Sequence, residues 1–371
     1  AGLLGDGIIG GVGAVLTFVP QILLMYLLLA LLDAVGYMSR AAFLMDKIMS
    51  RAGLEGRAFV AMLSSFACAI PGIMATRTIP SAKDRIATML GVPLATCSAR
   101  LPVYVLLVGM LIPNAAQVGP FSGRGVAMFL LYLLGAVSAM TAAWVVKKIT
   151  DRSGLLLPFY MEMPPYRIPT LRSVGIAMWE PTKAFLHKAG TIIMLTTIII
   201  WALTTFPMRS NAELTKAGID PSNDVAVAAY TMDHSIAARV GKAVEPVFEP
   251  LGFDWRVDVS LIRFLASREV AVSSLGQMAS ATDPEDDTEV AQQLDRWTWT
   301  HGEHQGEKIF TPATIVALIL FFAYALQCMS TVAIMKRETG GWKWPAIAFG
   351  YMFVLAWMMA FIGHLVTNLL I

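Results

Sequence analysis

Long runs of uncharged, mostly apolar residues constrain this chain more than any other feature. A helix of about 20 such residues crosses the roughly 30 Å hydrocarbon core of a bilayer. A transmembrane β-barrel would instead show stretches of about 10 residues in which apolar and polar residues alternate, and these runs do not alternate. The sequence therefore predicts an all-α, polytopic helical membrane protein with the lipid bilayer as its partner. The runs cover residues 7–32, 125–146, 189–208, 311–335 and 344–371.

Composition supports the same class. Of 371 residues, 56% are hydrophobic and 15% are charged, against about 25% charged in soluble domains. The net charge of +2, without a Lys/Arg block interleaved with aromatics, gives no indication of nucleic-acid binding. The three cysteines, Cys68, Cys97 and Cys328, are an odd set in apolar segments. They are expected to be free thiols with packing or metal-binding roles.

Charged residues predict how the chain crosses the membrane. Basic residues flank segment 58–76 on both sides, so the positive-inside rule places both of its ends in the cytoplasm. Segment 257–280 has polar flanks that belong outside. Each of these two segments should therefore be broken or re-entrant, one from each face. The eight predicted apolar units are 8–32, 58–76, 86–112, 124–148, 189–208, 257–280, 311–335 and 344–371.

Residues recur at matching spacings in the two halves, which indicates an internal repeat. The pairs are Arg40 with Arg239, Asp46 with Glu245, Gly53 with Gly252, Glu55 with Asp254, Arg57 with Arg256, Phe66 with Phe264 and Cys97 with Cys328. Because the first half starts outside and the second starts inside, the halves are expected to be inverted repeats, as in many transporters. The predicted organisation is a first membrane repeat (1–150), a basic cytoplasmic linker (151–188) and a second membrane repeat with polar outer loops (189–371).

Segments 58–76 and 257–280, which we call the gate segments, should each be interrupted near the middle. Pro71 and Gly72 lie inside an otherwise helical run, where proline removes a backbone donor and carbonyls are freed. An ordinary kinked helix is the alternative interpretation of the proline. In the second segment the break is expected from Ser267 to Val270, which includes Arg268.

Arg100 is expected near the centre of a helix of apolar residues, where a charge is a functional hypothesis by default. A structural ion pair is the alternative. Its expected partner is Glu269 or the carbonyls freed by a broken segment. Cys97 lies three residues before Arg100, so the two would share one face of a helix.

The cysteines predict a metal site. Thiolate and thioether ligands suit late or borderline divalent metals rather than Mg²⁺ or Ca²⁺. We expect Cys68, Cys97 and Cys328 to converge near one pathway, with Glu269, Ser98 or Met74 completing a transient site. A lone buried cysteine is more often a small hydrophobic residue, which is the alternative for each. The sequence contains no P-loop, nucleophile elbow or H-E-x-x-H helix, so a transporter without a cofactor is predicted rather than an enzyme.

The segments Ser64 to Arg77 and Cys97 to Tyr104 resemble the membrane region of bacterial ferrous iron transport protein B. Further similar segments are Asp6 to Gly13, Gly36 to Asp46, Ile236 to Trp255, and Cys328 to Thr331 with Lys336 to Thr339. The resemblance implies uptake of Fe²⁺ across the bacterial inner membrane through two gate regions related to those of nucleoside transporters.

Members of that family carry an N-terminal cytoplasmic GTP-binding domain, which holds their GTPase activity, and one more membrane helix before the point where this chain begins. The resemblance also implies small accessory iron-transport proteins as partners and a possible homo-oligomer. Two other functions stay open. A nucleoside-type symporter would need polar groups for base and ribose. A non-transporting gate-domain assembly module would have its centre sealed by bulky apolar residues.

Overall fold

The computed structural model describes residues 10–51, 53–113, 116–150, 235–266, 287–299, 305–326 and 328–370, with scattered positions between 166 and 206. Nearly all of these residues are helical, and the described part contains one short hairpin of two antiparallel strands, β1 (Gln117–Val118) and β2 (Phe121–Ser122). The predicted all-helical class is confirmed in this coarse sense.

The helices before residue 151 are α1 (Gly10–Val35), α2 (Tyr37–Arg51), α3 (Arg57–Ala67), α4 (Ala69–Ala75), α5 (Ala82–Gly91), α6 (Leu101–Leu111) and α7 (Gly123–Thr150), with short 3₁₀ helices η2 (Thr76–Thr78), η3 (Val92–Leu94) and η4 (Ser98–Arg100). Those after residue 234 are α11 (Ile236–Phe248), η5 (Glu249–Leu251), α12 (Trp255–Ala266), α14 (Asp287–Asp295), α15 (Pro312–Tyr324), α16 (Met329–Thr339) and α17 (Lys343–Leu370).

Four stretches of the described chain are long and apolar enough to cross a membrane: Ala82–Leu111, Gly123–Thr150, Pro312–Thr339 and Lys343–Leu370. A fifth is counted if Tyr26–Val35 and Tyr37–Arg51, which meet at 84°, form one bent span. A multi-pass membrane protein is therefore confirmed. The predicted unit 189–208 lies mostly outside the described residues.

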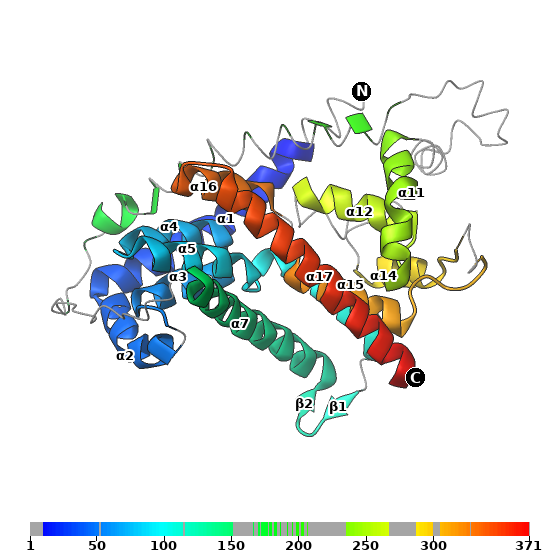
Figure 1. Cartoon of the computed structure of the whole chain (residues 1–371), viewed down its shortest axis with the longest axis horizontal. Coiled ribbons are helices and arrows are strands. Elements are labelled where there is room, and N and C mark those ends of the chain that lie inside the picture. Colours follow the sequence, from blue (N-terminus) through cyan, green and yellow to red (C-terminus); the bar gives the residue numbers. More distant parts are fainter. Residues whose placement is uncertain are drawn as a thin grey trace.

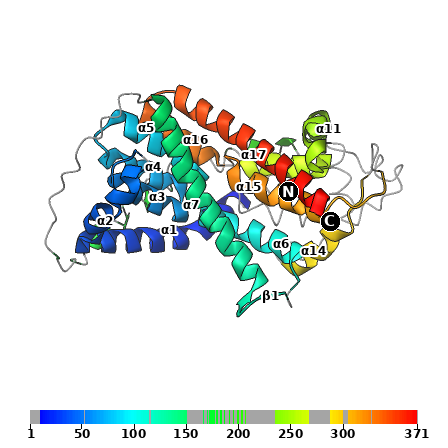
Figure 2. The same ribbon diagram turned by 60° about the horizontal axis from the view of Figure 1, so that its bottom comes forward.

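Helices α7 and α17 run along the molecule as its longest rods, and each has a shorter partner (Figure 1). α15 packs along α17, and α5 packs along α7. The short helices α2 to α5 gather at one end, where α1 runs beneath them in the turned view (Figure 2). The β1–β2 hairpin lies at the opposite end of α7 (Figure 1).

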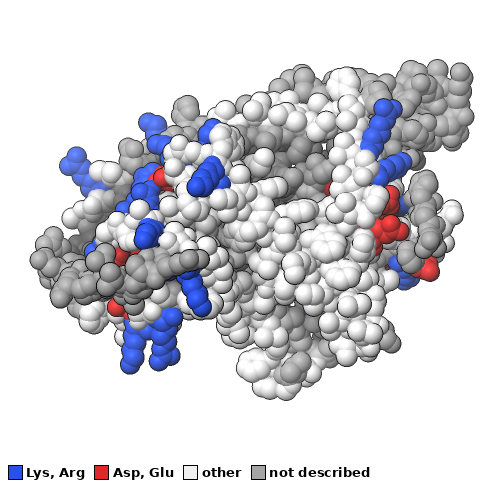
Figure 3. Space-filling model, in the orientation of Figure 1, with Lys and Arg blue, Asp and Glu red and all other residues white. Residues whose placement is uncertain are grey.

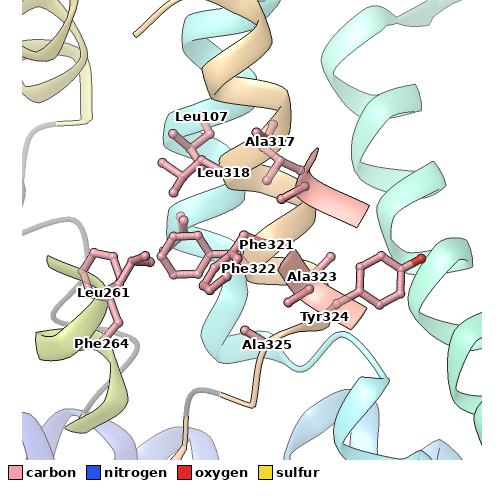
Figure 4. Close-up of a cluster of buried hydrophobic side chains, with 14 of the residues drawn as sticks. Leu107, Leu261, Phe264, Ala317, Leu318, Phe321, Phe322, Ala323, Tyr324 and Ala325 are labelled. Carbon is pink, nitrogen blue, oxygen red and sulfur yellow. The ribbon is translucent and has the colours of Figure 1, made fainter. Parts of the chain in front are cut away.

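Aromatic side chains on α15 form the centre of the main core (Figure 4). The Phe322 ring lies 5.0 Å from that of Phe264 on α12, and the Phe321 ring lies 5.8 Å from that of Phe248 on α11. Leu107 of α6 belongs to the same cluster. The core therefore joins helices from both ends of the sequence.

Charge is distributed unevenly over the surface. In the face shown in Figure 3, Lys and Arg gather mainly at the end where α2, α4 and α5 lie, and the broad middle has almost no charged side chains. Exposed residues at the basic end include Lys47, Arg51, Lys83 and Lys148. An apolar middle with a basic end is the pattern expected for a membrane protein that follows the positive-inside rule.

Candidate functional site

The first gate segment is broken at Cys68. Helix α3 ends at Ala67, Cys68 is extended with φ −158° and ψ 138°, and α4 starts at Ala69. The prediction of an interruption at Pro71-Gly72 was wrong by three residues, because both lie buried inside α4. Proline fits the first turn of a helix, where its missing N–H has no intrahelical partner to lose. The helix therefore restarts just before Pro71 and the break lies ahead of it.

A second break divides the unit predicted at 86–112. After α5 and η3 the chain is extended at Ala95 and Cys97, and η4 then leads into α6. Arg100 is the last residue of η4 and not the centre of a helix, which corrects the sequence interpretation. Prolines at the starts of η3 and α6, Pro93 and Pro102, are compatible with helix starts and unfavourable for a continuous helix.

A third break separates α15 from α16. Ala325 is extended with φ −68° and ψ 141°, and Cys328 is extended with φ −146° and ψ 103° directly before α16. Each of the three cysteines is therefore the residue directly before a new helix: Cys68 before α4, Cys97 before η4 and Cys328 before α16. From the sequence, only Cys68 was expected in a broken segment; the breaks at Cys97 and Cys328, and the position that the three cysteines share, were not predicted.

Arg100 joins two of these breaks. Its side chain is 1% exposed, and its guanidinium donates hydrogen bonds to backbone carbonyls on both sides. From the second break it reaches the carbonyl oxygens of Pro93, Leu94 and Ala95 at 3.3, 3.5 and 3.4 Å. From the end of α15 it reaches those of Ala323 and Ala325 at 2.9 and 3.3 Å.

These carbonyls belong to the last turns of helices and to extended residues, where no intrahelical donor is available. The helix C-terminus also carries a partial negative charge, which favours a cation. The expectation that freed carbonyls compensate Arg100 is confirmed. Glu269, the other expected partner, lies outside the described residues, as do Ser267 and Arg268.

The first two breaks are also tied together. The Ser98 hydroxyl donates to the carbonyl oxygen of Ala67 at 2.9 Å, next to Cys68. Met74 lies half-buried on α4, and α4 packs against α16, which begins after Cys328. Cys97 is 6% exposed, and Cys68 and Cys328 are half-buried. None of the three forms a disulfide in the part of the chain that the structure describes.

Within the described part of the chain, no three His, Cys, Asp or Glu side chains are grouped closely enough to hold a metal ion. Ser98 and Met74 are of other residue types, and Glu269 lies outside the described residues. The convergence of the cysteines on one ion therefore stays a prediction, which belongs to a conformer with metal bound.

Glu338 near the end of α16 was not anticipated as a functional residue. Its carboxylate accepts a hydrogen bond from Arg77 Nε at 2.9 Å and a second from Arg77 Nη2, and it pairs with Arg85 Nη2 at 2.9 Å. Arg77 follows α4 and Arg85 lies on α5. Through these contacts, Glu338 links α16, which follows the third break, to Arg77 and Arg85, which follow the first break. Its signal in the sequence is a carboxylate directly after two basic residues, Lys336 and Arg337.

An apolar groove of about 520 Å³ lies between α6, α7 and α15. Leu130, Leu133 and Val137 on α7 line it and are about half exposed, as expected for side chains that face lipid. Nearly all of its lining is apolar, so it offers no groups for a nucleoside base or ribose.

Comparisons with known proteins agree with these features. The model of the Gate family, described as nucleoside recognition, matches residues 15–111 and 186–342. The model described as ferrous iron transport protein B C terminus matches residues 128–180. No solved structure matches the chain.

Curated relatives match almost the whole chain. It is 40% identical to the Fe(2+) transporter FeoB of Leptospira interrogans (strain Fiocruz L1-130) over 99% of the chain and 51% of the relative. It is 40% identical to the Fe(2+) transport protein A/Fe(2+) transporter FeoB fusion protein of Porphyromonas gingivalis over 97% of the chain and 44% of that protein. It is 35% identical to the Fe(2+) transporter FeoB of Campylobacter jejuni over 100% of the chain and 56% of the relative.

The chain thus spans about half the length of the curated relatives it matches. The resemblance to ferrous iron transport protein B that was inferred from the cysteine motifs is confirmed by these matches. Because the Gate model covers more than half of the chain, the protein belongs to the Gate, or nucleoside recognition, family, and its whole length is similar to Fe(2+) transporter FeoB proteins.

Proposed function

We propose that this protein moves ferrous iron across the bacterial inner membrane, past the three helix breaks at Cys68, Cys97 and Cys328. The observation that carries the proposal is the position of the cysteines: each lies at a break within the apolar helical region, in a chain similar over its whole length to Fe(2+) transporters. Thiolates suit a borderline metal such as Fe²⁺. Irregular backbone at membrane depth is tolerated where it is buried in protein or lines a wet cavity.

The proposed ligands are Cys68, Cys97 and Cys328, with Glu269, Ser98 or Met74 completing the site. A transported ion must be able to leave, so we expect two or three protein ligands with water rather than a closed cage. Pro71, Gly72, Arg100, Ser267 and Arg268 form the gate around them. Arg100 supports this role because it holds two breaks together through backbone carbonyls.

An inverted repeat underlies the proposed mechanism, in which the two gate regions alternate. Local geometry at the paired positions supports it. Gly53 and Gly252 both have positive φ, 72° and 78°. Glu55 pairs with Arg57 at 3.5 Å, and Asp254 pairs with Arg256 at 3.3 Å. Each proposed half ends in a helix of 28 residues, α7 or α17.

We place the basic end of the molecule in the cytoplasm, with residues 151–188 as a cytoplasmic linker. Proposed partners are a cytoplasmic GTP-binding domain, small accessory iron-transport proteins and further copies of the chain. The name of the P. gingivalis relative, a fusion with Fe(2+) transport protein A, supports an accessory protein. A nucleoside symporter or a non-transporting module is not favoured, because the relatives named above are Fe(2+) transporters.

Uptake of radiolabelled Fe²⁺ into proteoliposomes containing the full-length protein tests the proposal. We expect Cys68→Ser and Cys97→Ser each to lower the initial rate about tenfold or more, which corresponds to loss of roughly 1.4 kcal/mol of interaction with the ion. Met74→Leu should have a smaller effect. Met110→Leu, on α6 and away from the breaks, is the matched control and should transport normally. Full uptake by the Cys68→Ser, Cys97→Ser double variant would reduce the cysteines to packing residues.

A further inference from the structure

Three carboxylates lie close together on α11 and α12, in a place to which the proposed iron pathway assigns no role. Glu245 is on α11, Asp254 directly precedes α12, and Asp258 is in the first turn of α12. Asp254 and Asp258 are four residues apart, so they lie on one face of the helix. They are 1% and 2% exposed.

The cations near these carboxylates are few. Arg256 Nε lies 3.3 Å from Asp254 Oδ2, and the Arg256 guanidinium also lies 5.2 Å from the Trp297 ring centre. Lys242 of α11 lies over the Trp255 ring at 4.8 Å. On α17, His364 packs against the backbone at Gly252. Neither oxygen of Asp258 accepts a hydrogen bond from any residue that the structure describes.

Asp254 and Asp258 are both buried beside one paired arginine, and ionising both is unfavourable because an unpaired buried charge loses its hydration without compensation. Burial, followed by the charge of Glu245, raises the pKa of Asp258 to about 9. Burial also raises the pKa of Asp254 to about 7, against the opposing effect of Arg256. Helix α12 is not among the helices long enough to span the membrane.

The hairpin α2–α3, which corresponds to α11–α12 in the proposed repeat, has no acid at the position equivalent to Asp258. There, Asp46 accepts a hydrogen bond from the Gly56 amide at 2.8 Å, and Glu55 pairs with Arg57. Two residues after the paired arginine the first hairpin has Phe59, whereas the second has Asp258. A buried, uncompensated acid at a position where an aromatic residue serves the same fold is a mark of function.

We propose that Asp258, together with Asp254, is a proton-binding site that loses protons when a divalent cation passes, so that inward metal movement is exchanged for protons. This inference rests on the proposed iron transport. In the step, a carboxylic O–H bond breaks, the proton goes to water, and a carboxylate remains, with no electron transfer. By linkage, a cation that favours the carboxylate weakens proton binding, and protons weaken binding of the cation by the same free energy.

The test uses the full-length protein in weakly buffered proteoliposomes, with a pH-sensitive dye outside and anaerobic Fe²⁺ kept reduced by ascorbate. For the wild type we expect proton release during uptake, above that of protein-free vesicles. The initial uptake rate should fall about threefold or more from pH 7.5 to 5.5, because a higher proton concentration competes more strongly with the cation for these carboxylates. Asp258→Asn has the shape of the neutral acid, and should show less proton release and a flatter pH profile.

Asp295→Asn is the matched control, because Asp295 is exposed and pairs with Lys308 at 2.8 Å on the surface. It should behave as the wild type does. Wild-type Fe²⁺ uptake without proton release would overturn the inference even if the Asp258→Asn protein failed to fold. Equal proton release by wild type and folded Asp258→Asn would also overturn it. Absence of any wild-type Fe²⁺ uptake would overturn the proposed transport function, and this inference with it.

Discussion

In each of the hairpins α2–α3 and α11–α12, the backbones of the two helices approach closely at a glycine. The glycine belongs to the second helix segment in one hairpin and to the first helix in the other. In the first, Gly56 lies just before α3, and a Cβ there would be 2.4 Å from the Ala42 carbonyl oxygen of α2. In the second, the glycine is Gly241 on α11, and a Cβ there would be 3.0 Å from the Trp255 carbonyl oxygen. The two hairpins therefore share the approach of their backbones and not the residue type at each position.

The hairpins differ in their charges and in what surrounds their turns. The acids of the first are bonded to a backbone amide and to an arginine, whereas the second carries the additional buried Asp258. At the turns, a Cβ on Gly53 would make only an ordinary contact with Lys147 Cγ at 3.6 Å, but a Cβ on Gly252 would be 2.6 Å from Thr314 Oγ1 and 2.9 Å from His364 Cε1. The first turn thus has room for a Cβ, whereas the second is packed tightly against α15 and α17.

The largest effect should come from Arg100, which only the first half supplies. Arg100→Met leaves carbonyls from both breaks without their donor, and each buried acceptor left unsatisfied costs about 1–3 kcal/mol. Thermal unfolding of the purified protein in detergent should show this loss. Thr331→Val, three residues after Cys328 as Arg100 is after Cys97, is the control, and should cost about 1 kcal/mol. Similar losses for both would contradict a special role for Arg100.

The next largest effect concerns the turn glycines. Gly252→Ala combines left-handed backbone strain of about 1–2 kcal/mol with overpacking of about 1–3 kcal/mol. Gly53→Ala should cost only the strain, because its Cβ would meet only Lys147 Cγ, at 3.6 Å. Comparison of the two melting temperatures measures the difference. If Gly53→Ala is the more damaging, the tighter packing of the second turn is refuted.

A moderate effect should appear as pH is varied. The folded-state pKa values of Asp254 and Asp258 are raised to about 7 and about 9, so the folded protein holds protons that the unfolded chain has released above pH 4. The contribution of these groups to the free energy of unfolding is greatest below about pH 4. It is lost progressively as the pH rises through the folded-state pKa values of about 7 and about 9. Melting temperatures from pH 5 to 9 should therefore fall less steeply for Asp258→Asn than for the wild type. A wild-type slope retained in that variant would place the titrating groups elsewhere.

The smallest effect should come from the ion pair of the first hairpin. Arg57 is partly exposed and pairs with Glu55 at 3.5 Å, so Arg57→Gln should cost about 0–1 kcal/mol. Arg256→Gln should cost more, because its partner Asp254 is almost fully buried. Unfolding curves at low and high salt measure both, and only the Arg57 pair should weaken clearly in high salt. Equal costs would mean that burial does not distinguish the two pairs.

The cysteine segments show how far the sequence could be interpreted. Pro-Gly within an apolar run correctly indicated a break in residues 58–76, but proline alone does not state on which side of it the helix stops. Arg100 was correctly expected to need freed carbonyls, yet it was placed at the centre of a helix because periodicity does not reveal the extended residues Ala95 and Cys97. Glu338 was overlooked, since a carboxylate among basic residues near a helix end is ordinary in a sequence.

The amino-acid sequence is sufficient to assign this protein to its class. A bilayer demands apolar segments of fixed minimum length with their backbone bonds satisfied internally, and both demands are visible in local composition. Which groups compensate the buried charges depends on the tertiary structure. Ala323 and Ala325 lie more than 200 residues from Arg100 along the chain, and among the described residues none donates a hydrogen bond to the buried Asp258. Compensation of a buried charge depends on distances in space, and spacing along the chain specifies those only within a single helix.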